Sequence, residues 1–556
     1  MDEIAASFIL ENARVLTLDS RRPAAAALAI AGDRVVAVGT RRDVRRWRDR
    51  RTRVLDLRGA TVVPGLVDTH AHLEREGLKS IYPSLAHCRS IADVQAVVRR
   101  LAARTPKGEW IVTMPLGAPP FYADPPATLA ERRWPTRADL DAAAPGHPVY
   151  VRGIWGYWSK PPVYSVASSA ALRRAGITRD TVPPAGVELL RDEAGEPTGV
   201  FVEHNLIQVL EFTLMRAVPR FTAAQRLGAL DASQKIYAAR GVTAIYEGHG
   251  VAPEVLAVYR QAHAAGTLRL RATLALSATW QGAREGERAL PDLAAWAGGA
   301  GLGDARLRVQ GLCLHYGGDP VVAAILHASQ PYTGWAGFVE SANSREDYTR
   351  QAALAARLGL RVTTLVTRCL PEVLEIWEKI AGETPLAPLR WVLVHLAAAT
   401  SDQLARIRRL GAVATTNPIS YLWRSGAAEV ARAGGAAETL LPHRSLARLR
   451  IPFGLATDNK PADPWLAFNA VVHRRDMATG APLGPRERLT PSQALTALTV
   501  GGAYVTLAER DRGRLAPGYA ADLAVLEQDP LTAPPEALAG QTARLTMVAG
   551  EVVHRA

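Results

Sequence analysis

The sequence predicts an α/β fold whose centre is a TIM-like (β/α)8 barrel. Three observations support this fold class. Apolar strand-like segments alternate with helical segments through the middle of the chain, a short apolar run at 62–67 leads into two histidines, and short alternating strands occur at both ends. Strands that alternate with helices form a parallel sheet, and about eight such units close a barrel.

The predicted barrel strands of the central region are short apolar runs bounded by helical segments. They are 242–246, 270–276, 307–315, 361–366, 390–395, 411–416 and 451–457. Catalytic side chains of such barrels lie at the carboxyl ends of the strands. We therefore expect the histidines and acids that end these segments to share one site.

The two ends of the chain have the alternating character of antiparallel strands. Residues 8–19 and 27–39 read in this way, with a hairpin turn at Gly32-Asp33, and so do residues 513–527 and 543–554. Both ends are therefore expected to form small sheets outside the barrel.

Composition indicates an ordinary globular enzyme. A chain of 556 residues that is 48% hydrophobic can bury a large core and form more than one structural unit. No run approaches 18 apolar residues, the N-terminus is acidic where a signal peptide is basic, and only three cysteines occur. These features predict a cytoplasmic protein without a membrane span or a disulfide framework.

The net charge of +13 raises the question of a nucleic-acid partner. Arginine carries most of this charge, and the densest run is 41–53. A charge run without a reading motif is weak evidence for phosphate binding, and we expect this one to be a solvated helix. The predicted partner is a small-molecule substrate, with neither nucleic acid nor membrane; the sequence is also compatible with a homodimer.

His70 and His72 are the strongest candidates for metal ligands. Side chains two apart in a strand point the same way, and two neutral imidazoles supply half of a tetrahedral shell. The alternative is a pair of surface histidines after a buried strand. The phrase P-G-L-V-D-T-H-A-H-L at 64–73 resembles the first metal motif of the amidohydrolase superfamily, which implies that both histidines are ligands.

The resemblance extends from residue 8 to residue 554. Segments 165–187 and 192–203 are similar to an inserted region of the N-substituted formamide deformylase-like branch, the third large amidohydrolase family. This resemblance implies a composite β-sandwich built from 1–63 and 501–556. It also implies a metal-dependent hydrolase barrel over 64–500, with an insertion at about 75–240.

Two further positions match the family's site. In R-W-V-L-V-H-L, His395 ends the sixth strand, where the family has a metal-site histidine. In I-P-F-G-L-A-T-D-N-K, Asp458 ends the eighth strand and matches the aspartate that ligates the metal and shuttles the proton. The alternatives are a core histidine with satisfied hydrogen bonds and a helix N-cap aspartate.

The metal site is atypical for this branch. The branch usually reads G-V-K-x-x-x-D-G at the fourth strand, where Cys313 replaces the lysine, and H-A-x-G-D at the fifth, where Thr363 or Thr364 replaces the histidine. The branch's G-H-x-x-x-x-N-S phrase appears at 153–160 as G-I-W-G-Y-W-S-K, and no lysine is expected at an inward strand end. We therefore expect one divalent ion, Zn²⁺ first, with Mn²⁺, Fe²⁺ or Co²⁺ as alternatives.

Other side chains can replace the lysine and histidine ligands that are missing from the branch's pattern. His315 is the first candidate, because it lies nearer the end of its strand than Cys313, which is the second. Glu247 and His249 share one side of the third strand, and His249 is a candidate ligand or acid–base group. His204 is a weaker candidate, expected on a helix outside the barrel.

The expected chemistry is hydrolysis of an amide-type C–N bond, such as that of an amide, a formamide or a cyclic imide, with Asp458 handling the proton. Aromatic residues expected in loops suit an apolar or aromatic substrate, and Arg424 could pair a carboxylate. These aromatic residues are Trp155, Tyr157, Trp158, Tyr421, Trp423 and Trp465. Two other readings stay open: a decarboxylase or deaminase on the same barrel, and a degenerate member without activity.

Overall fold

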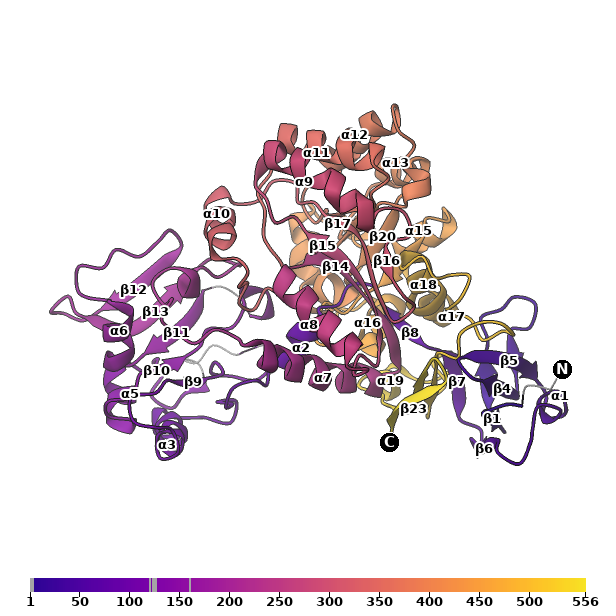
Figure 1. Cartoon of the computed structure of the whole chain (residues 1–556), viewed down its shortest axis with the longest axis horizontal. Helices are drawn as coiled ribbons and strands as arrows, with labels where there is room; N and C mark the ends of the chain where they lie inside the picture. Colours follow the sequence, from indigo (N-terminus) through magenta and orange to yellow (C-terminus); the bar gives the residue numbers. More distant parts are fainter. Residues whose placement is uncertain (1–4, 120–121, 123–127, 160–161) are drawn as a thin grey trace.

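The computed structural model describes residues 5–119, 122, 128–159 and 162–556. Its centre is a barrel of eight parallel strands in the order β21-β20-β19-β18-β17-β15-β14-β8 (Figure 1). The backbone N–H of Thr69, which follows β8, donates to the carbonyl oxygen of Leu455 in β21 at 3.2 Å and joins the first strand to the last. The strands are β8 (Leu66–Asp68), β14 (Val242–Val251), β15 (Arg271–Ser277), β17 (Leu307–Cys313), β18 (Val362–Leu365), β19 (Val392–Val394), β20 (Val413–Thr416) and β21 (Phe453–Leu455).

The predicted α/β barrel is confirmed, and all seven predicted segments contain a barrel strand. Strand β14 is longer than predicted, because it continues to Val251. Strand β17 is shorter than predicted and ends two residues before His315. A short strand, β16 (Leu302–Gly303), pairs antiparallel with β17. The strand ends that carry the candidate residues therefore meet at one mouth of the barrel.

Helices surround the barrel, and the largest hydrophobic cluster fills the layer between helices and strands. Trp377 and Trp391, each 0–1% exposed, pack edge to face in this layer with ring centroids 5.0 Å apart. The helices are α2 (Leu73–Leu78), α7 (Ala223–Ala239), α8 (Pro253–Ala264), α9 (Gly282–Ala297), α10 (Pro320–Ser329), α11 (Arg345–Arg357), α12 (Leu370–Ala381), α13 (Ser401–Leu410), α14 (Gly426–Arg432), α15 (His443–Arg448), α16 (Pro464–His473), α17 (Pro491–Thr496), α18 (Gly502–Val505) and α19 (Pro535–Leu538).

The two chain ends build one β-sandwich beside the barrel, as the resemblance implied. C-terminal strand β22 pairs antiparallel with N-terminal strand β7, with Val525 opposite Val62. One sheet has the order β24-β23-β22-β7-β2-β3 and the other β5-β4-β1-β6, and a shared core of buried aliphatic residues lies between them. The strands are β1 (Phe8–Glu11), β2 (Arg14–Leu16), β3 (Ala24–Ala25), β4 (Ala27–Ala31), β5 (Arg34–Gly39), β6 (Arg53–Asp56), β7 (Thr61–Pro64), β22 (Leu523–Leu526), β23 (Ala543–Val548) and β24 (Glu551–Arg555).

The predicted hairpin at Gly32-Asp33 joins β4 to β5, and Gly32 has the positive φ of +58° that such tight turns favour. The predicted solvated helix over 41–53 is correct only in part. Helix α1 covers Arg41–Arg45, and the chain then turns into β6. The N-cap Thr40 and Asp43 form a capping box that starts this short helix.

The long segment between β8 and β14 contains a sheet of its own, at the opposite end of the barrel from the sandwich (Figure 1). Its strands have the order β12-β13-β11-β10-β9, and two hydrophobic clusters bury its faces. The elements are β9 (Ile111–Thr113), β10 (Val149–Val151), β11 (Val163–Ala167), β12 (Val187–Arg191), β13 (Pro197–Glu203), α3 (Ile91–Ala102), α5 (Arg137–Ala143) and α6 (Ser169–Ala175).

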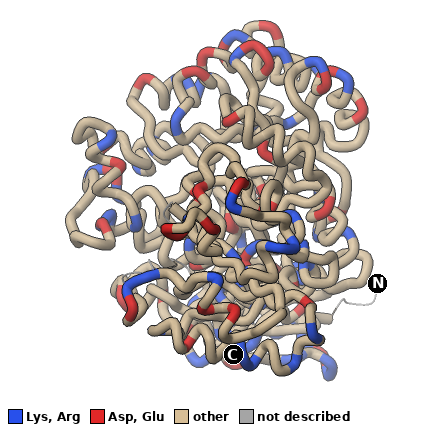
Figure 2. Tube along the Cα trace, turned by 90° about the vertical axis from the view of Figure 1, so that its left-hand side faces the viewer, with Lys and Arg blue, Asp and Glu red and all other residues tan. Residues whose placement is uncertain are grey.

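Basic and acidic positions are interspersed along the trace on the side that Figure 2 shows. Many of the arginines pair with carboxylates, as Arg152 does with Glu211 and Arg271 with Asp522. Within the described part of the chain, every helix is too short or too polar to cross a membrane.

Candidate metal centre

His70 and His72 follow β8 and turn their rings toward Asp458, which follows β21. The Nε2 atom of His70 lies 3.6 Å from Oδ1 of Asp458, and Nε2 of His72 lies 3.4 Å from the same oxygen. All three side chains are at most 3% exposed. The two imidazoles lie on one side, as predicted, although both residues follow the end of β8, and barrel closure brings the aspartate to them.

His395 follows β19 and completes this group. Its Nε2 atom lies 3.6 Å from Oδ2 of Asp458, and its ring centroid lies 4.5 Å from that of His70. Both His395 and Asp458 have left-handed backbone conformations, with φ of +57° and +53°. Such strain in residues other than glycine is concentrated at functional sites, where the surrounding structure enforces it.

The spacing of these atoms fits a bound divalent ion. Zinc–nitrogen bonds of about 2.0–2.1 Å in a tetrahedron place neighbouring ligand atoms about 3.3–3.4 Å apart. The three nitrogen–oxygen separations are 3.4–3.6 Å. Nε2 of His70 and Nε2 of His72 are buried and have no hydrogen-bond partner among the described residues, as expected of lone pairs that await a cation.

The protonation states also suit metal binding, because ligating imidazoles are neutral. Burial holds the pKa of His70 well below its ordinary value and lowers the pKa of His395 to about 4. Burial would raise the pKa of Asp458, but Lys460 and the surrounding imidazoles lower it well below its usual range. Asn417 Nδ2 lies 3.1 Å from Nε2 of His395 and must release that nitrogen when an ion binds.

Glu247 on β14 orients His72. Its Oε2 atom lies 3.1 Å from Nδ1 of His72, and its Oε1 accepts from the backbone N–H of Leu73 at 2.9 Å and from the hydroxyl of Tyr259 at 2.7 Å. A carboxylate on Nδ1 keeps the proton there and leaves the Nε2 lone pair for a ligand. Glu247 thus orients a ligand of the centre and is not itself one of the proposed ligands.

Asp68 and Asn459 connect the first and last strands beneath the centre. Asp68 accepts from the backbone N–H groups of His70 at 3.2 Å and Thr457 at 3.1 Å, and from the Thr457 hydroxyl at 2.5 Å. Burial raises the pKa of Asp68 to about 7 although these bonds oppose the shift. The side-chain oxygen of Asn459 accepts from the backbone N–H of His72 at 2.8 Å, so both histidines are fixed at the backbone.

Lys460 faces the centre from beyond the eighth strand, although no lysine was expected there from the sequence, and it does not occupy the fourth-strand position of the family's bridging lysine. Its Nζ donates to Oδ2 of Asp458, it is 6% exposed, and it lies 5.3 Å from the ring centre of Tyr157. Oδ1 of the aspartate remains directed at His70 and His72. Strand alternation could not have identified this lysine, because β21 ends at Leu455 and both Asp458 and Asn459 have positive φ.

The fourth and fifth strands differ from the expected coordination. Thr363 donates its hydroxyl to the carbonyl oxygen of Gly248 at 2.7 Å, and Thr364 donates to that of Leu314 at 3.1 Å, so both hydroxyls tie strands together. Cys313 is 1% exposed and, among the described residues, belongs to no cluster of convergent ligand atoms.

His249, on β14, and His315, which follows β17, lie beside this centre. The ring of His249 is 5.8–5.9 Å from those of His70 and His72, and 5.3 Å from that of His315. Ligand atoms of His249 also group with those of His70 and His72. His315 instead groups with His249 and with Glu340, a residue that no sequence motif indicated.

The aromatic candidates divide into two sets. Tyr157 is 37% exposed, and the hydroxyl of Tyr421 lies 3.2 Å from Nδ1 of His395, so both lie near the mouth. Trp155 (3% exposed) and Trp158 (0%) are enclosed in a hydrophobic cluster of the insertion. Trp155 is connected to the centre through Phe338, whose ring centroid is 6.0 Å from its own, and through Tyr157, whose ring centroid is 4.8 Å away.

Four other candidates lie at positions that the structure describes. Arg424 donates to the carbonyl oxygen of Ser159 at 3.4 Å, and its neighbour Trp423 is half-buried. Trp465 is not in a loop as expected but is fully buried on α16. His204 follows strand β13 rather than lying on a helix, and it pairs with Glu188 at 2.7 Å, away from the centre.

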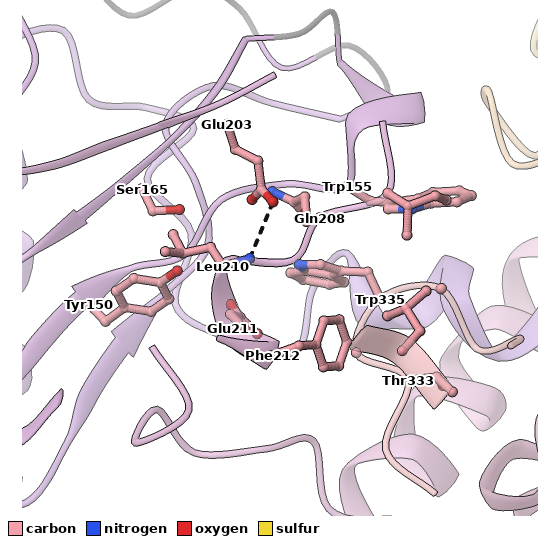
Figure 3. A pocket seen from close by; sticks show the side chains of 14 residues that line it. Tyr150, Trp155, Ser165, Glu203, Gln208, Leu210, Glu211, Phe212, Thr333 and Trp335 are labelled. Carbon is pink, nitrogen blue, oxygen red and sulfur yellow. Dashed lines mark hydrogen bonds between the residues drawn. The ribbon is translucent and has the colours of Figure 1, made fainter. Parts of the chain in front are cut away.

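A separate cavity lies in the insertion, between β10, β13 and the segment that carries Trp335 (Figure 3). The cavity has a volume of about 20 Å³, which is enough for about one water molecule. Glu203 accepts there from the backbone N–H of Leu210 at 3.2 Å, while its Oε2 has no partner among the described residues. Burial raises the pKa of Glu203 to about 8.

Comparisons with known proteins agree with this architecture. The family model described as "Amidohydrolase family" matches residues 53–554. The chain is 27% identical over 554 residues to the N-substituted formamide deformylase of Arthrobacter pascens, covering 94% of this chain and 93% of that protein. It is 24% identical over 519 residues to the putative amidohydrolase YtcJ of Bacillus subtilis, covering 90% of each.

The fold is also found in a solved structure. The crystal structure of an uncharacterized metal-dependent hydrolase from Pyrococcus furiosus aligns with a TM-score of 0.68 at 23% identity, covering 94% of this chain and all of that one. Likeness at this identity concerns the fold. Because the family model spans the whole barrel, the last two N-terminal strands of the sandwich and all of its C-terminal strands, the chain belongs to the amidohydrolase family.

Proposed function

We propose that this protein is a metal-dependent hydrolase whose ion is held by His70, His72, His395 and Asp458. The observation that carries the proposal is the convergence of three imidazole nitrogens on one buried carboxylate at 3.4–3.6 Å. Three nitrogens and one oxygen at this spacing form a donor set that suits zinc, with Mn²⁺, Fe²⁺ and Co²⁺ as alternatives.

The residues around the ion have separate tasks. When bound, a divalent ion at such a site makes hydroxide available from water near neutral pH and polarises a substrate carbonyl. Asp458 accepts the proton of the attacking water and returns it to the leaving nitrogen. Lys460 holds Oδ2 of Asp458 by its Nζ and thereby keeps the other oxygen directed at the histidines.

The substrate that we propose carries an amide-type C–N bond in an amide, a formamide or a cyclic imide. The relative named N-substituted formamide deformylase supports this choice, because it aligns over nearly the full length of both chains. Tyr157 and Tyr421, which lie beside Lys460 and His395, suit an apolar or aromatic substrate portion. His249 is a second candidate for moving a proton, since its ring lies beside those of His70 and His72.

Metal content and product analysis test the proposal together. We expect one tightly bound divalent ion per chain after purification without added metal, and hydrolysis of at least one member of a panel of N-substituted formamides, amides and cyclic imides. Loss of carbon dioxide, or deamination without acyl cleavage, would instead support a lyase or a deaminase. Absence of metal uptake on titration would indicate a degenerate member.

A further inference from the structure

Outside the four proposed ligands, the barrel mouth contains a second group of convergent donors. His249, His315 and Glu340 each offer one ligand atom, and these atoms lie within 4.8 Å of one another. His249 is on β14, His315 follows β17, and Glu340 is in the segment between α10 and α11. Two imidazoles and one carboxylate form a common donor set for divalent transition ions.

The segment that carries Glu340 is fixed against three barrel strands. The carbonyl oxygen of Gly337 accepts from the backbone N–H of Ala252 at 2.9 Å, and Val339 donates its N–H to the hydroxyl of Ser277 at 3.1 Å. Asn343 donates its side-chain amide to the carbonyl oxygen of His315 at 2.9 Å. These bonds hold the carboxylate beside the two histidines before any ligand arrives.

Phe338 in the same segment sets the orientation of His249. The two rings are stacked, with centroids 3.9 Å apart and an interplanar angle of 14°. The ring of His315 is perpendicular to that of His249 at 5.3 Å. The imidazoles are thus held at an angle to each other rather than stacked together, which allows their nitrogens to converge on one point.

Within the described part of the chain, the carboxyl of Glu340 has His315 as its electrostatic partner. Among the described residues, neither lysine nor arginine lies within ion-pair distance of Glu340, and burial raises the pKa of its carboxyl. Nε2 of His315 is buried and has no hydrogen-bond partner in the described part of the chain. A buried carboxyl and an unpartnered imidazole nitrogen both gain from a cation between them.

We propose that His249, His315 and Glu340 bind a second divalent cation, more weakly than the first centre does. The two centres are adjacent, and the second does not use the lysine position that Cys313 occupies. Its affinity is lower because three side chains hold the second ion, whereas four side chains converge at the first centre.

Binding at Nε2 of His315 requires the proton to be on Nδ1. That nitrogen accepts from the backbone N–H of Ser341 at 3.3 Å, and the Ser341 hydroxyl lies 3.4 Å away. An ion at Nε2 therefore replaces the bond from the backbone N–H with one from Nδ1–H to the hydroxyl oxygen. Ser341→Ala removes this acceptor and should weaken the second ion only.

The test is a calorimetric titration of the chelator-treated full-length protein with Zn²⁺, repeated with Co²⁺ to record visible absorption. We expect a tight first equivalent and a second at least tenfold weaker. Glu340→Gln and His315→Ala should each remove the second equivalent and keep the first. Ser341→Ala should weaken binding of the second equivalent. His204→Ala, which removes an exposed histidine, is the matched control and should keep both.

The outcomes distinguish the second ion site from the proposed hydrolase function. One equivalent in the wild type, or a second equivalent unchanged in Glu340→Gln and His315→Ala, would overturn this inference while leaving the proposed hydrolase intact. Absence of a tightly bound first equivalent in the wild type would instead contradict the proposed function. Because Glu340→Gln preserves shape and Ser341→Ala removes one oxygen, a folded variant, verified by circular dichroism, is available even if His315→Ala fails to fold.

Discussion

Oε2 of Glu247 lies 3.1 Å from Nδ1 of His72, and both side chains are at most 4% exposed. The same carboxylate accepts from Tyr259 and from the backbone of Leu73. This contact determines which nitrogen of His72 faces the centre, and it links β14, the second barrel strand, to the histidine pair that follows the first.

Glu247→Gln should therefore lower the affinity for the first ion about 10- to 100-fold, the effect usual for an outer-shell partner of a metal-bound histidine. An amide accepts less strongly from Nδ1–H and offers a donor to the backbone N–H of Leu73, where an acceptor is needed. The measurement is a competition titration with a chromophoric chelator. Glu188→Gln, in the exposed pair with His204, is the matched control, and equal effects in the two variants would contradict the orienting role.

Asp458→Asn should lower turnover by about 10²–10⁴, because asparagine keeps an oxygen donor but cannot accept the proton. The protein should remain folded and should retain part of its metal affinity. Steady-state kinetics with metal content measured on the same sample separate the two effects. Activity near that of the wild type would show that His249 or another group carries the proton.

Lys460→Met should move the acid limb of the kcat/KM profile to higher pH. The lysine lowers the pKa of Asp458, so its removal raises that pKa and leaves the carboxyl protonated over a wider acidic range. Lys460→Arg keeps the charge and is the control. A profile unchanged in the methionine variant would indicate that the bound ion alone sets this pKa.

Glu203→Gln should stabilise the protein at pH 8 more than at pH 5. Burial raises the pKa of Glu203 from 4.5 to about 8, so between these values the folded state binds a proton that the unfolded state has released. The free energy of unfolding then falls as pH rises through this window, and glutamine abolishes that loss. We expect a gain of at least about 1 kcal/mol at pH 8 in urea denaturation.

The matched control for this prediction is Glu193→Gln, which changes an exposed glutamate after β12. Its effect on the free energy of unfolding should be small at both pH values. A Glu203→Gln variant with the same effect at pH 5 and pH 8 would show that the carboxyl is ionised in the folded protein across this range.

The sequence by itself determined the barrel and the histidine pair, and its resemblance to the amidohydrolase superfamily implied the paired chain ends and the rest of the candidate site. The barrel and the histidine pair depend on short-range information: apolar runs bounded by helices, and the two-residue period that places His70 and His72 together. His395 and Asp458 could be found because His395 directly follows β19, Asp458 comes three residues after β21, and the parallel strands of a barrel all end at the same mouth.

Tertiary structure alone decided which side chains meet at that mouth. The position of Glu340 depends on a segment that local patterns do not describe, and the separation of His315 from Asp458 depends on the spacing of strands around the barrel. The burial of Trp465 depends on which face of α16 meets the core. Such contacts join residues far apart in the chain, and only the closed barrel determines their distances, because each strand's place depends on all the others.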